Sequence, residues 1–173
     1  MDHLLSCDSV RIVAATDRRD WKHRSLHPLE TQIRSAAGTH IPVLISANRA
    51  RARTIASQIH QRSAQRDHAL LEVDCSAASH GYEQQVFQTD VGESGSMLLL
   101  EVNHLPASMQ LRLRARLTVE ARARAMGPAS ALIGRRRLLA TCSGSLFEAV
   151  ERGLFDRDLF YRLNVIHIVP NGL

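Results

Sequence analysis

Short apolar runs alternate with longer amphipathic segments along most of the chain. This alternation is typical of parallel β-strands connected by helices, because both faces of such strands are buried. The runs that predict strands are residues 10–15, 42–46, 69–74, 97–101, 137–142 and 165–169. We therefore expect an α/β protein with a mostly parallel sheet.

The segments between these runs predict helices. They are residues 27–37, 49–62, 106 to about 125, 146–152 and 155–163. In the third of them, Met109, Leu113 and Leu117 recur four apart, which places them on one helical face, and Pro106 suits a first helical turn. The alternation of leucine and arginine over residues 111–114 would also fit a strand.

The composition permits a single globular domain with a sizeable core, since 45% of the 173 residues are hydrophobic and 23% are charged. Among the 22 lysine and arginine residues, only Lys22 is a lysine. A phosphate loop of the form G-x-x-x-x-G-K-[ST] needs a lysine after its glycines, and Lys22 is followed by His23 with no glycine upstream. The sequence therefore excludes a standard nucleotide-hydrolysing P-loop.

The formal net charge of +5 is distributed in blocks. Residues 67–110 contain acids but no lysine or arginine, whereas residues 112–137 are rich in arginine and contain one acid, Glu120. The candidates for nucleic-acid binding are the arginines of the third predicted helix: Arg112, Arg114, Arg116, Arg122 and Arg124. At about 100° per residue they spread around the helix, which favours a solvated face over a duplex-binding surface.

The cysteines indicate a reducing environment. Cys7, Cys75 and Cys142 are far apart and form no C-x-x-C motif, so neither a disulfide framework nor a zinc site is expected. The N-terminus lacks the features of a signal peptide, and no apolar run is long enough to cross a membrane. The expected location is the cytoplasm.

One histidine pair has the spacing of a metal site. His23 and His27 are four residues apart, and Asp20 is nearby. Pro28 follows directly and no second ligand cluster is visible, so no metal site is predicted.

The most specific pattern lies near the C-terminus. Residues 153–165 read GLFDRDLFYRLNV, which resembles the segment G-R-F-R-E-D-L-Y-Y-R-L-N-V of bacterial enhancer-binding proteins, the AAA+ activators of sigma-54 RNA polymerase. Four earlier segments resemble that family in the same order: PVLISANRARARTIASQIHQRS (P-loop strand and helix), LLEVDCSAAS (next strand), SGSMLLLEVNHLPASMQLRLRARL (Walker B strand and helix) and RRRLLATCSGSLFEAVERG (sensor I strand and helix). Together the segments cover roughly residues 28–170.

The resemblance implies the fold of an AAA+ large subdomain, a three-layer α/β sandwich with a mostly parallel five-stranded sheet. It divides the chain into an N-terminal extension, residues 1–26, which could add a strand, and a sigma-54-interaction AAA+-like domain, residues 27–173. The family's long insertion with the G-A-F-T-G-A loop, which contacts the sigma factor, is missing between Phe87 and Ser96. We also expect this domain to lack the family's helical lid.

The nucleotide-binding positions of the family are altered. The segment SANRARART contains no glycine and places Ala52 where the family has its lysine, with Arg51 and Arg53 beside it. Glycines let successive backbone N–H groups curl around a phosphate, and a wide guanidinium does not replace a lysine beneath the phosphates. The same positions would include Ser143, which replaces the asparagine of sensor I.

The catalytic positions change in the same direction. In the Walker B pair, Leu100 replaces the acid that would hold Mg²⁺, while Glu101 retains the acid that would orient the attacking water. In the arginine-finger segment, Asp156 replaces the first arginine and Arg162 retains the second. Glu101 and Arg162 are therefore the catalytic candidates. A structural role is the alternative for Glu101, and an ion pair is favoured for Arg162.

These residues predict a degenerate sigma-54-activator-like domain that acts as a transcription-related interaction or regulatory module with weak or no ATP binding. No cofactor is expected, and ATP with Mg²⁺ is implied by the resemblance alone. The expected partners are a second copy of the chain or a related AAA+ subunit, whereas sigma-54 contact is not expected without the contact loop. Two alternatives stay open: an active ATPase with an unorthodox phosphate loop, and a small arginine-rich nucleic-acid-associated protein.

Overall fold

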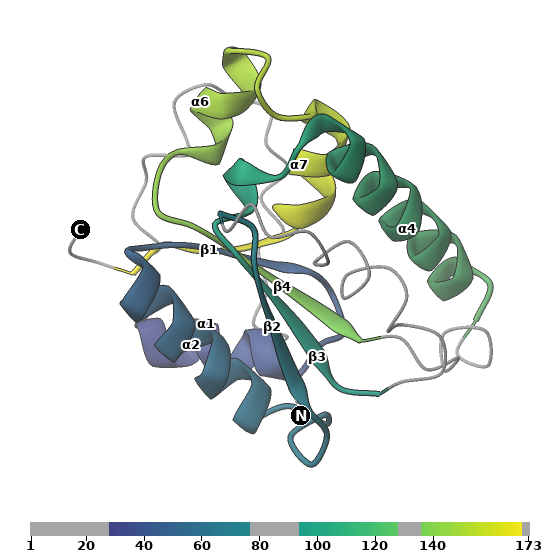
Figure 1. Cartoon of the computed structure of the whole chain (residues 1–173). Coiled ribbons are helices and arrows are strands. Elements are labelled where there is room, and N and C mark those ends of the chain that lie inside the picture. The colour runs from purple at the N-terminus through teal and green to yellow at the C-terminus, as the bar shows by residue number, and fades with distance from the viewer. Residues whose placement is uncertain (1–27, 77–93, 128–135, 171–173) are drawn as a thin grey trace, which may run out of the picture.

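The computed structural model describes residues 28–76, 94–127 and 136–170. Within these residues, one parallel sheet (Figure 1) is formed by β1 (Val43–Ser46), β2 (Leu70–Asp74), β3 (Ser96–Leu100), β4 (Arg137–Cys142) and β5 (Ile166–Ile168). The order across the five-stranded sheet is β2-β3-β4-β1-β5. β1, the first of the described strands in the sequence, thus lies between β4 and β5, and Val43 pairs with both Leu139 and Ile166.

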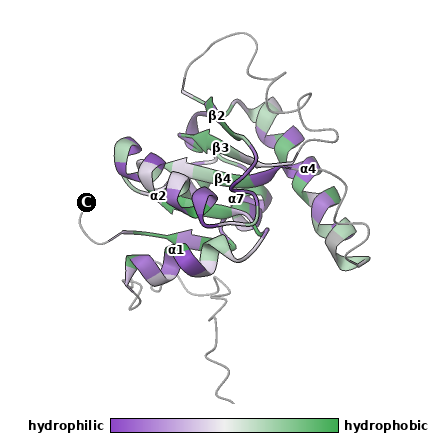
Figure 2. Ribbon diagram, turned by 90° about the horizontal axis from the view of Figure 1, so that it is seen from below, coloured by the Kyte–Doolittle hydropathy of each residue, from purple (hydrophilic) through white to green (hydrophobic). Residues whose placement is uncertain are grey.

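Helices cover both faces of this sheet (Figure 1). On one face lie α1 (Leu29–Ala37) and α2 (Arg49–Gln61). On the other lie α4 (Ala107–Ala125), α6 (Leu146–Glu151) and α7 (Arg157–Leu163), and the short 3₁₀ helix η2 (Val102–His104) follows β3. Figure 2 shows mainly hydrophobic strands between these helices. The three-layer α/β sandwich is therefore confirmed.

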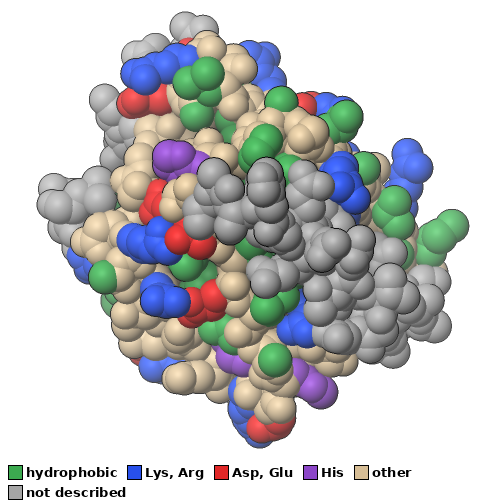
Figure 3. All heavy atoms as spheres, in the orientation of Figure 1, with side chains coloured by type: hydrophobic (Ala, Val, Ile, Leu, Met, Phe, Trp, Pro, Cys, Tyr) green, Lys and Arg blue, Asp and Glu red, His purple; other side chains and the backbone are tan. Residues whose placement is uncertain are grey.

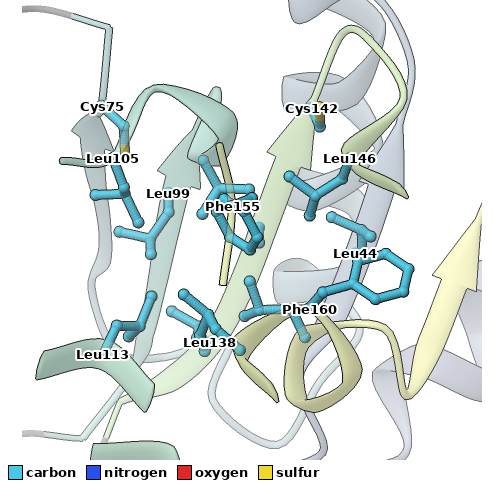
Figure 4. Packing of buried hydrophobic residues seen from close by; sticks show 14 of the residues in the cluster. Leu44, Cys75, Leu99, Leu105, Leu113, Leu138, Cys142, Leu146, Phe155 and Phe160 are labelled. Carbon is cyan, nitrogen blue, oxygen red and sulfur yellow. The ribbon is translucent and has the colours of Figure 1, made fainter. Parts of the chain in front are cut away.

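The core has two halves because alternate residues of a strand point to opposite faces of the sheet. Leu44 and Leu99 face α4, α6 and α7, where they pack with the side chains drawn in Figure 4. Val43, Leu98 and Leu100 face α1 and α2. All of these side chains are buried. Because both faces are apolar, the strands appear in the sequence as continuous apolar runs.

The predicted elements agree closely with the structure. Each predicted strand that falls in the described residues is displaced by no more than one residue at either end. The segment 111–114 is helical, so the strand alternative for it is wrong. Glu101 does not continue β3 as expected, because its left-handed backbone (φ 55°) ends the strand. The predicted strand 10–15 and the extension 1–26 lie outside the described residues.

A glycine fixes the start of β3. Gly95 has a φ of 122°, and a Cβ there would collide with the carbonyl oxygen of Ala69. Its N–H donates to Oε1 of Gln65 at 2.9 Å, and its carbonyl accepts from the N–H of Arg137 at 2.9 Å. Only a residue without a side chain permits this close approach at the amino edge of the sheet.

Candidate functional site

The parallel sheet brings most of the predicted site residues to one edge. β1, β3 and β4 all run in the same direction, so the N-terminus of α2, Glu101 and Ser143 lie together at the carboxyl ends of the strands. Ligands of open α/β sheets bind at this edge. The carboxyl edge is therefore the place to look for a nucleotide site.

No glycine loop separates β1 from α2. Ala47 and Asn48 alone connect them, and α2 begins at Arg49. The side-chain oxygen of Asn48 accepts a hydrogen bond from the N–H of Arg51 at 3.0 Å and so caps the helix. In a phosphate loop such N–H groups bind the anion. The helix predicted over residues 49–62 is therefore confirmed, and its cap starts it directly after Asn48.

Hydrocarbon fills the position of the family's lysine. Ala52 has no exposed surface and belongs to the same buried cluster as Ala47 and Leu100. Leu100, at the position of the Mg²⁺-binding acid, is also buried. A charged group placed against this cluster would lose its hydration and gain no oppositely charged partner there. The environment at the α2 N-terminus is thus apolar on its inner side.

Acids of β2 hold the arginines of α2. Arg49 forms an ion pair with Asp74, and Arg53 forms one with Glu72. The hydrogen bond from Arg49 and two from Ser76, at 3.0 and 2.6 Å, hold the pKa of Asp74 well below its usual range. Figure 3 shows blue and red side chains next to one another on this face. The guanidinium of Arg53, which the resemblance places beside the lysine position, is thus paired with the edge strand β2.

Arg49 and Asp74 are the residues of this edge that the sequence interpretation missed. The sequence does contain a pattern that indicates the two ion pairs. Arg49 and Arg53 are four residues apart on a helix, and Glu72 and Asp74 are two residues apart on a strand. Both spacings place the two side chains on one face. Which helix meets which strand, however, follows only from the sheet order.

Glu101 and Ser143, which belong to two different segments of the resemblance, contact each other. Glu101 is buried, and its Oε2 accepts hydrogen bonds from the backbone N–H and the hydroxyl of Ser143, at 3.0 and 2.8 Å. The backbone N–H of Glu101 donates to Oγ1 of Thr141 at 3.1 Å. Glu101 is also close enough to Arg49 to contribute to the raised pKa of that guanidinium, whose main cause is the hydrogen bond with Asp74. The acid therefore has partners within its own chain.

The arginine-finger segment forms α7. Asp156 caps this helix by accepting from the N–H of Leu159 at 2.7 Å, and it pairs with Arg114 of α4 at 2.8 Å. Arg162 is partly buried, and its Nε has no hydrogen-bond partner. In the described part of the chain, no hydrogen bond or ion pair joins Arg162 to Glu101 or Ser143. The structure therefore does not unite the two catalytic candidates.

The two cysteine side chains at this edge, Cys75 and Cys142, are buried and carry protonated thiols. Burial raises the pKa of the Cys75 thiol to about 12 and that of Cys142 to about 11, so both thiols are protonated near neutral pH. Among the described residues, no cluster of three or more histidine, cysteine, aspartate or glutamate side chains could hold a metal ion. The predicted histidine pair, His23 and His27, lies outside the described residues. In the same residues, no helix has the length and apolar character needed to cross a membrane.

Parallel strands in the order β2-β3-β4-β1-β5, flanked by helices on both faces, define an α/β fold of the P-loop NTPase type. The family model for the sigma-54 interaction domain matches residues 82–169, which is half of the chain. The chain belongs to the sigma-54 interaction domain family.

Curated relatives of the chain are transcription regulators. The DNA-binding transcriptional activator HyfR of Escherichia coli (strain K12) is 26% identical over 163 residues, which are 84% of this chain and 24% of HyfR. The nitric oxide reductase transcription regulator NorR1 of Cupriavidus necator is 29% identical over 161 residues, 83% of this chain and 30% of NorR1. The chain thus spans less than a third of the length of these relatives.

Solved structures show the same fold. NtrX from Brucella abortus in complex with ADP matches with a TM-score of 0.65 at 20% identity, over 82% of this chain and 35% of NtrX. The P-loop NTPase domain of a sigma-54 activator from E. coli matches with a TM-score of 0.59 at 16% identity, over 82% of this chain and 99% of that domain. At these identities the likeness concerns the fold alone.

Proposed function

We propose that this sigma-54-activator-like AAA+ domain does not bind ATP and acts as an interaction or regulatory module in transcription control. The observation that carries the proposal is the buried apolar cluster of Ala47, Ala52 and Leu100 at the β1–α2 junction. It lies where the resemblance implies phosphates, a lysine and Mg²⁺.

Three requirements of a nucleotide site fail at this junction. The helix N-terminus offers fewer free donors, because Asn48 already accepts from the N–H of Arg51. Ala52 supplies no positive charge, and Leu100 supplies no oxygen to a hard cation such as Mg²⁺. Since the triphosphate carries several negative charges, the loss of all three contacts removes the electrostatic basis of its binding.

The extent of the family match supports this view. The matched segment begins at residue 82, after β2, and includes β3, β4 and α7. It does not extend over β1 and α2, the elements that would form the phosphate site. The family model therefore matches the chain outside the elements that would form the phosphate site.

The partners of the module are proposed to be a second copy of this chain or a related AAA+ subunit in the cytoplasm. Support comes from α7, where Arg157 is exposed and Arg162 has an unsatisfied Nε. The resemblance implies that arginines of this segment reach into a neighbouring subunit. Contact with sigma-54 is not part of the proposal, because the sequence between Phe87 and Ser96 is too short for the family's contact loop.

The test is nucleotide binding by the purified chain. We expect no saturable heat with Mg-ATP or Mg-ADP in calorimetry and no rise of the unfolding temperature at millimolar nucleotide. A ligand present at 100 times its Kd would stabilise the fold by about 2.7 kcal/mol, which a thermal shift readily detects. Saturable binding would overturn the proposal.

Two variants identify the cause if binding is found. Turnover that is lost in Glu101→Gln would establish the active-ATPase alternative. Stabilisation by nucleotide that is lost in Arg53→Gln would show that this guanidinium replaces the lysine. The matched control is Arg62→Gln, at the other end of α2, where Arg62 pairs with Glu30 at 2.6 Å.

A further inference from the structure

A buried histidine lies where the C-terminal end of α2 meets the start of β3. His60 is 6% exposed, and its two ring nitrogens have partners from different parts of the chain. Nδ1 is 2.9 Å from the hydroxyl oxygen of Ser96, the first residue of β3, and Nε2 is 3.1 Å from the carbonyl oxygen of His68. The imidazole therefore links β3 to the α2–β2 connection, residues 62–69, at the amino edge of the sheet (Figure 1).

These partners determine which ring nitrogen carries the hydrogen. A carbonyl oxygen can only accept, so Nε2 donates to His68. In the neutral imidazole Nδ1 is then an acceptor, and the hydroxyl of Ser96 donates to it. Protonation would place a hydrogen on Nδ1 as well, so that this hydroxyl could only accept. Ser96 has no exposed surface, and its hydroxyl has no other hydrogen-bond partner among the described residues, so the hydroxyl hydrogen would be left unsatisfied.

A buried arginine acts on the same histidine. Arg137, the first residue of β4, is 3% exposed, and its positive charge opposes the protonation of His60. The guanidinium donates to the carbonyl oxygen of Ala36 near the end of α1, whereas its Nε and Nη1 have no hydrogen-bond partner. Burial lowers the pKa of Arg137 to about 10, so the group stays charged near neutral pH. A proton on His60 would thus add a positive charge near an arginine that pairs with no acid among the described residues.

No acid of the described residues offsets these charges at His60. The other titratable group that faces the imidazole is the exposed His68, whose charge is also repulsive. Toward α1, Glu30 is exposed and pairs with Arg62 at 2.6 Å, and β1 and β3 add apolar side chains to this half of the core. Burial, as the main cause, and the charge of Arg137 lower the pKa of His60 from its ordinary value of 6.5, although the hydrogen bond with His68 acts in the opposite direction.

We propose that His60 is a pH-sensitive switch that holds the α2–β2 connection against β3 while the imidazole is neutral and releases it on acidification. Two bonds next to the His60–Ser96 contact should open with it. The N–H of Ser96 donates to the carbonyl oxygen of Ala69 at 3.0 Å, and the N–H of Gly95 donates to Oε1 of Gln65 at 2.9 Å. Because β2 is at an edge of the described sheet, this end can open without separating the other strands.

The direction of the pH effect follows from the lowered pKa of His60. The open form takes up a proton more readily than the closed form, so acidification favours opening. The stability that His60 gives to the closed form is therefore fully present above pH 6.5 and is lost as the pH falls below this value.

This inference is separate from the proposed loss of ATP binding. His60 is in the last turn of α2, whereas the phosphate site would lie at the first turn of this helix. Nucleotide binding and release by acid are measured separately, so each proposal can fail alone.

The test is hydrogen exchange of the full chain, measured by NMR between pH 7.5 and pH 5.5 and corrected for the intrinsic pH dependence of exchange. Protection of the Gly95 and Ser96 amides should fall by about three-fold or more, since the uptake of one proton permits at most about ten-fold per pH unit. His60→Gln has an uncharged side chain and should make this protection independent of pH. The matched control is His104→Gln, at an exposed histidine of η2, which should leave the pH effect unaltered.

The ring of His60 gives a second measurement that needs no variant. In the unaltered chain, its carbon-bound protons should titrate with a midpoint below pH 6.5. A midpoint at or above this value would overturn the inference, as would amide protection that does not change with pH or that changes equally in His60→Gln. Loss of the pH effect in His68→Gln but not in His60→Gln would assign the effect to His68 and would also overturn the inference.

Discussion

The two halves of the carboxyl edge have diverged in different ways. At the β1–α2 junction, Ala52 and Leu100 fill the site with hydrocarbon, and the nearby Arg49 is paired with Asp74. At the ends of β3 and β4, the carboxyl group of Glu101 is buried and accepts two hydrogen bonds from Ser143. The comparison teaches that a binding edge can lose its ligand in two ways. Charged groups can be replaced by apolar ones, or they can be satisfied by the protein itself.

The largest expected effect comes from restoring the lysine. Ala52→Lys places an ammonium against the buried apolar cluster of Ala47 and Leu100 and should lower the free energy of unfolding by about 3 kcal/mol or more. Chemical denaturation measures the change. Ala50→Lys, at an exposed position of the same helix, is the control and should change stability by less than about 0.5 kcal/mol. Unaltered stability of Ala52→Lys would show that the junction is open to water.

The polar half of the edge should respond less strongly. Glu101→Ala leaves the N–H and hydroxyl of Ser143 without their acceptor and should cost about 2 kcal/mol of unfolding free energy. Ser143→Ala removes only the hydroxyl donor and should cost about 1 kcal/mol. A double-mutant cycle should give a coupling above about 0.5 kcal/mol. Strict additivity of the two changes would mean that the pair does not stabilise the edge.

Removal of the Asn48 cap of α2 should have a smaller effect on the free energy of unfolding. Asn48→Ala removes the acceptor for the N–H of Arg51 and should lower the unfolding free energy by about 1 kcal/mol. Asn48→Asp keeps an acceptor at the helix N-terminus and should be nearly neutral. If Asn48→Ala acquires affinity for phosphate or ATP, the cap alone would have blocked the helix N-terminus, and the apolar filling would matter less than proposed.

The smallest expected effect is the pH dependence of the Asp74 ion pair. The pKa of Asp74 is lowered in the folded chain, mainly by the hydrogen bond from Arg49. The contribution of Asp74 to the free energy of unfolding is therefore fully present above its ordinary pKa of 3.8, the value expected in the unfolded chain. This contribution is lost as the pH falls below about 4. Asp74→Asn should flatten this part of the stability curve, measured by denaturation between pH 5 and pH 2. Asp67→Asn, at an exposed position, is the control and should leave the curve unchanged.

Much of the fold could be predicted because apolar runs and helical spacing are local properties. Residues 137–142 match β4 at both ends, since arginine and polar residues flank a run that is buried on both faces. Such runs are recognised without knowledge of which elements meet in space. The resemblance assigned Glu101 and Ser143 to two separate positions, and their contact with each other was not predicted.

The rest could not be predicted because it depends on contacts between distant residues or on the backbone. The pairing of Arg49 with Asp74 requires α2 to lie over β2, which the sequence does not state. The positive φ of Glu101 belongs to a residue type that rarely adopts it. Asn48 did carry a local signal, because asparagine directly before a helical run is a preferred cap, and the helix predicted over residues 49–62 does begin after it.

The place of β1 in the sheet has a consequence for how the chain acquires its structure. β1 leaves the ribosome early, yet both of its neighbours, β4 and β5, are synthesised much later. Until they emerge, its backbone donors and acceptors and the side chains of Val43, Leu44 and Ile45 lack their final partners. A nascent chain of this topology exposes an unpaired apolar strand from the emergence of β1 until that of β4, which makes this interval a period of aggregation risk.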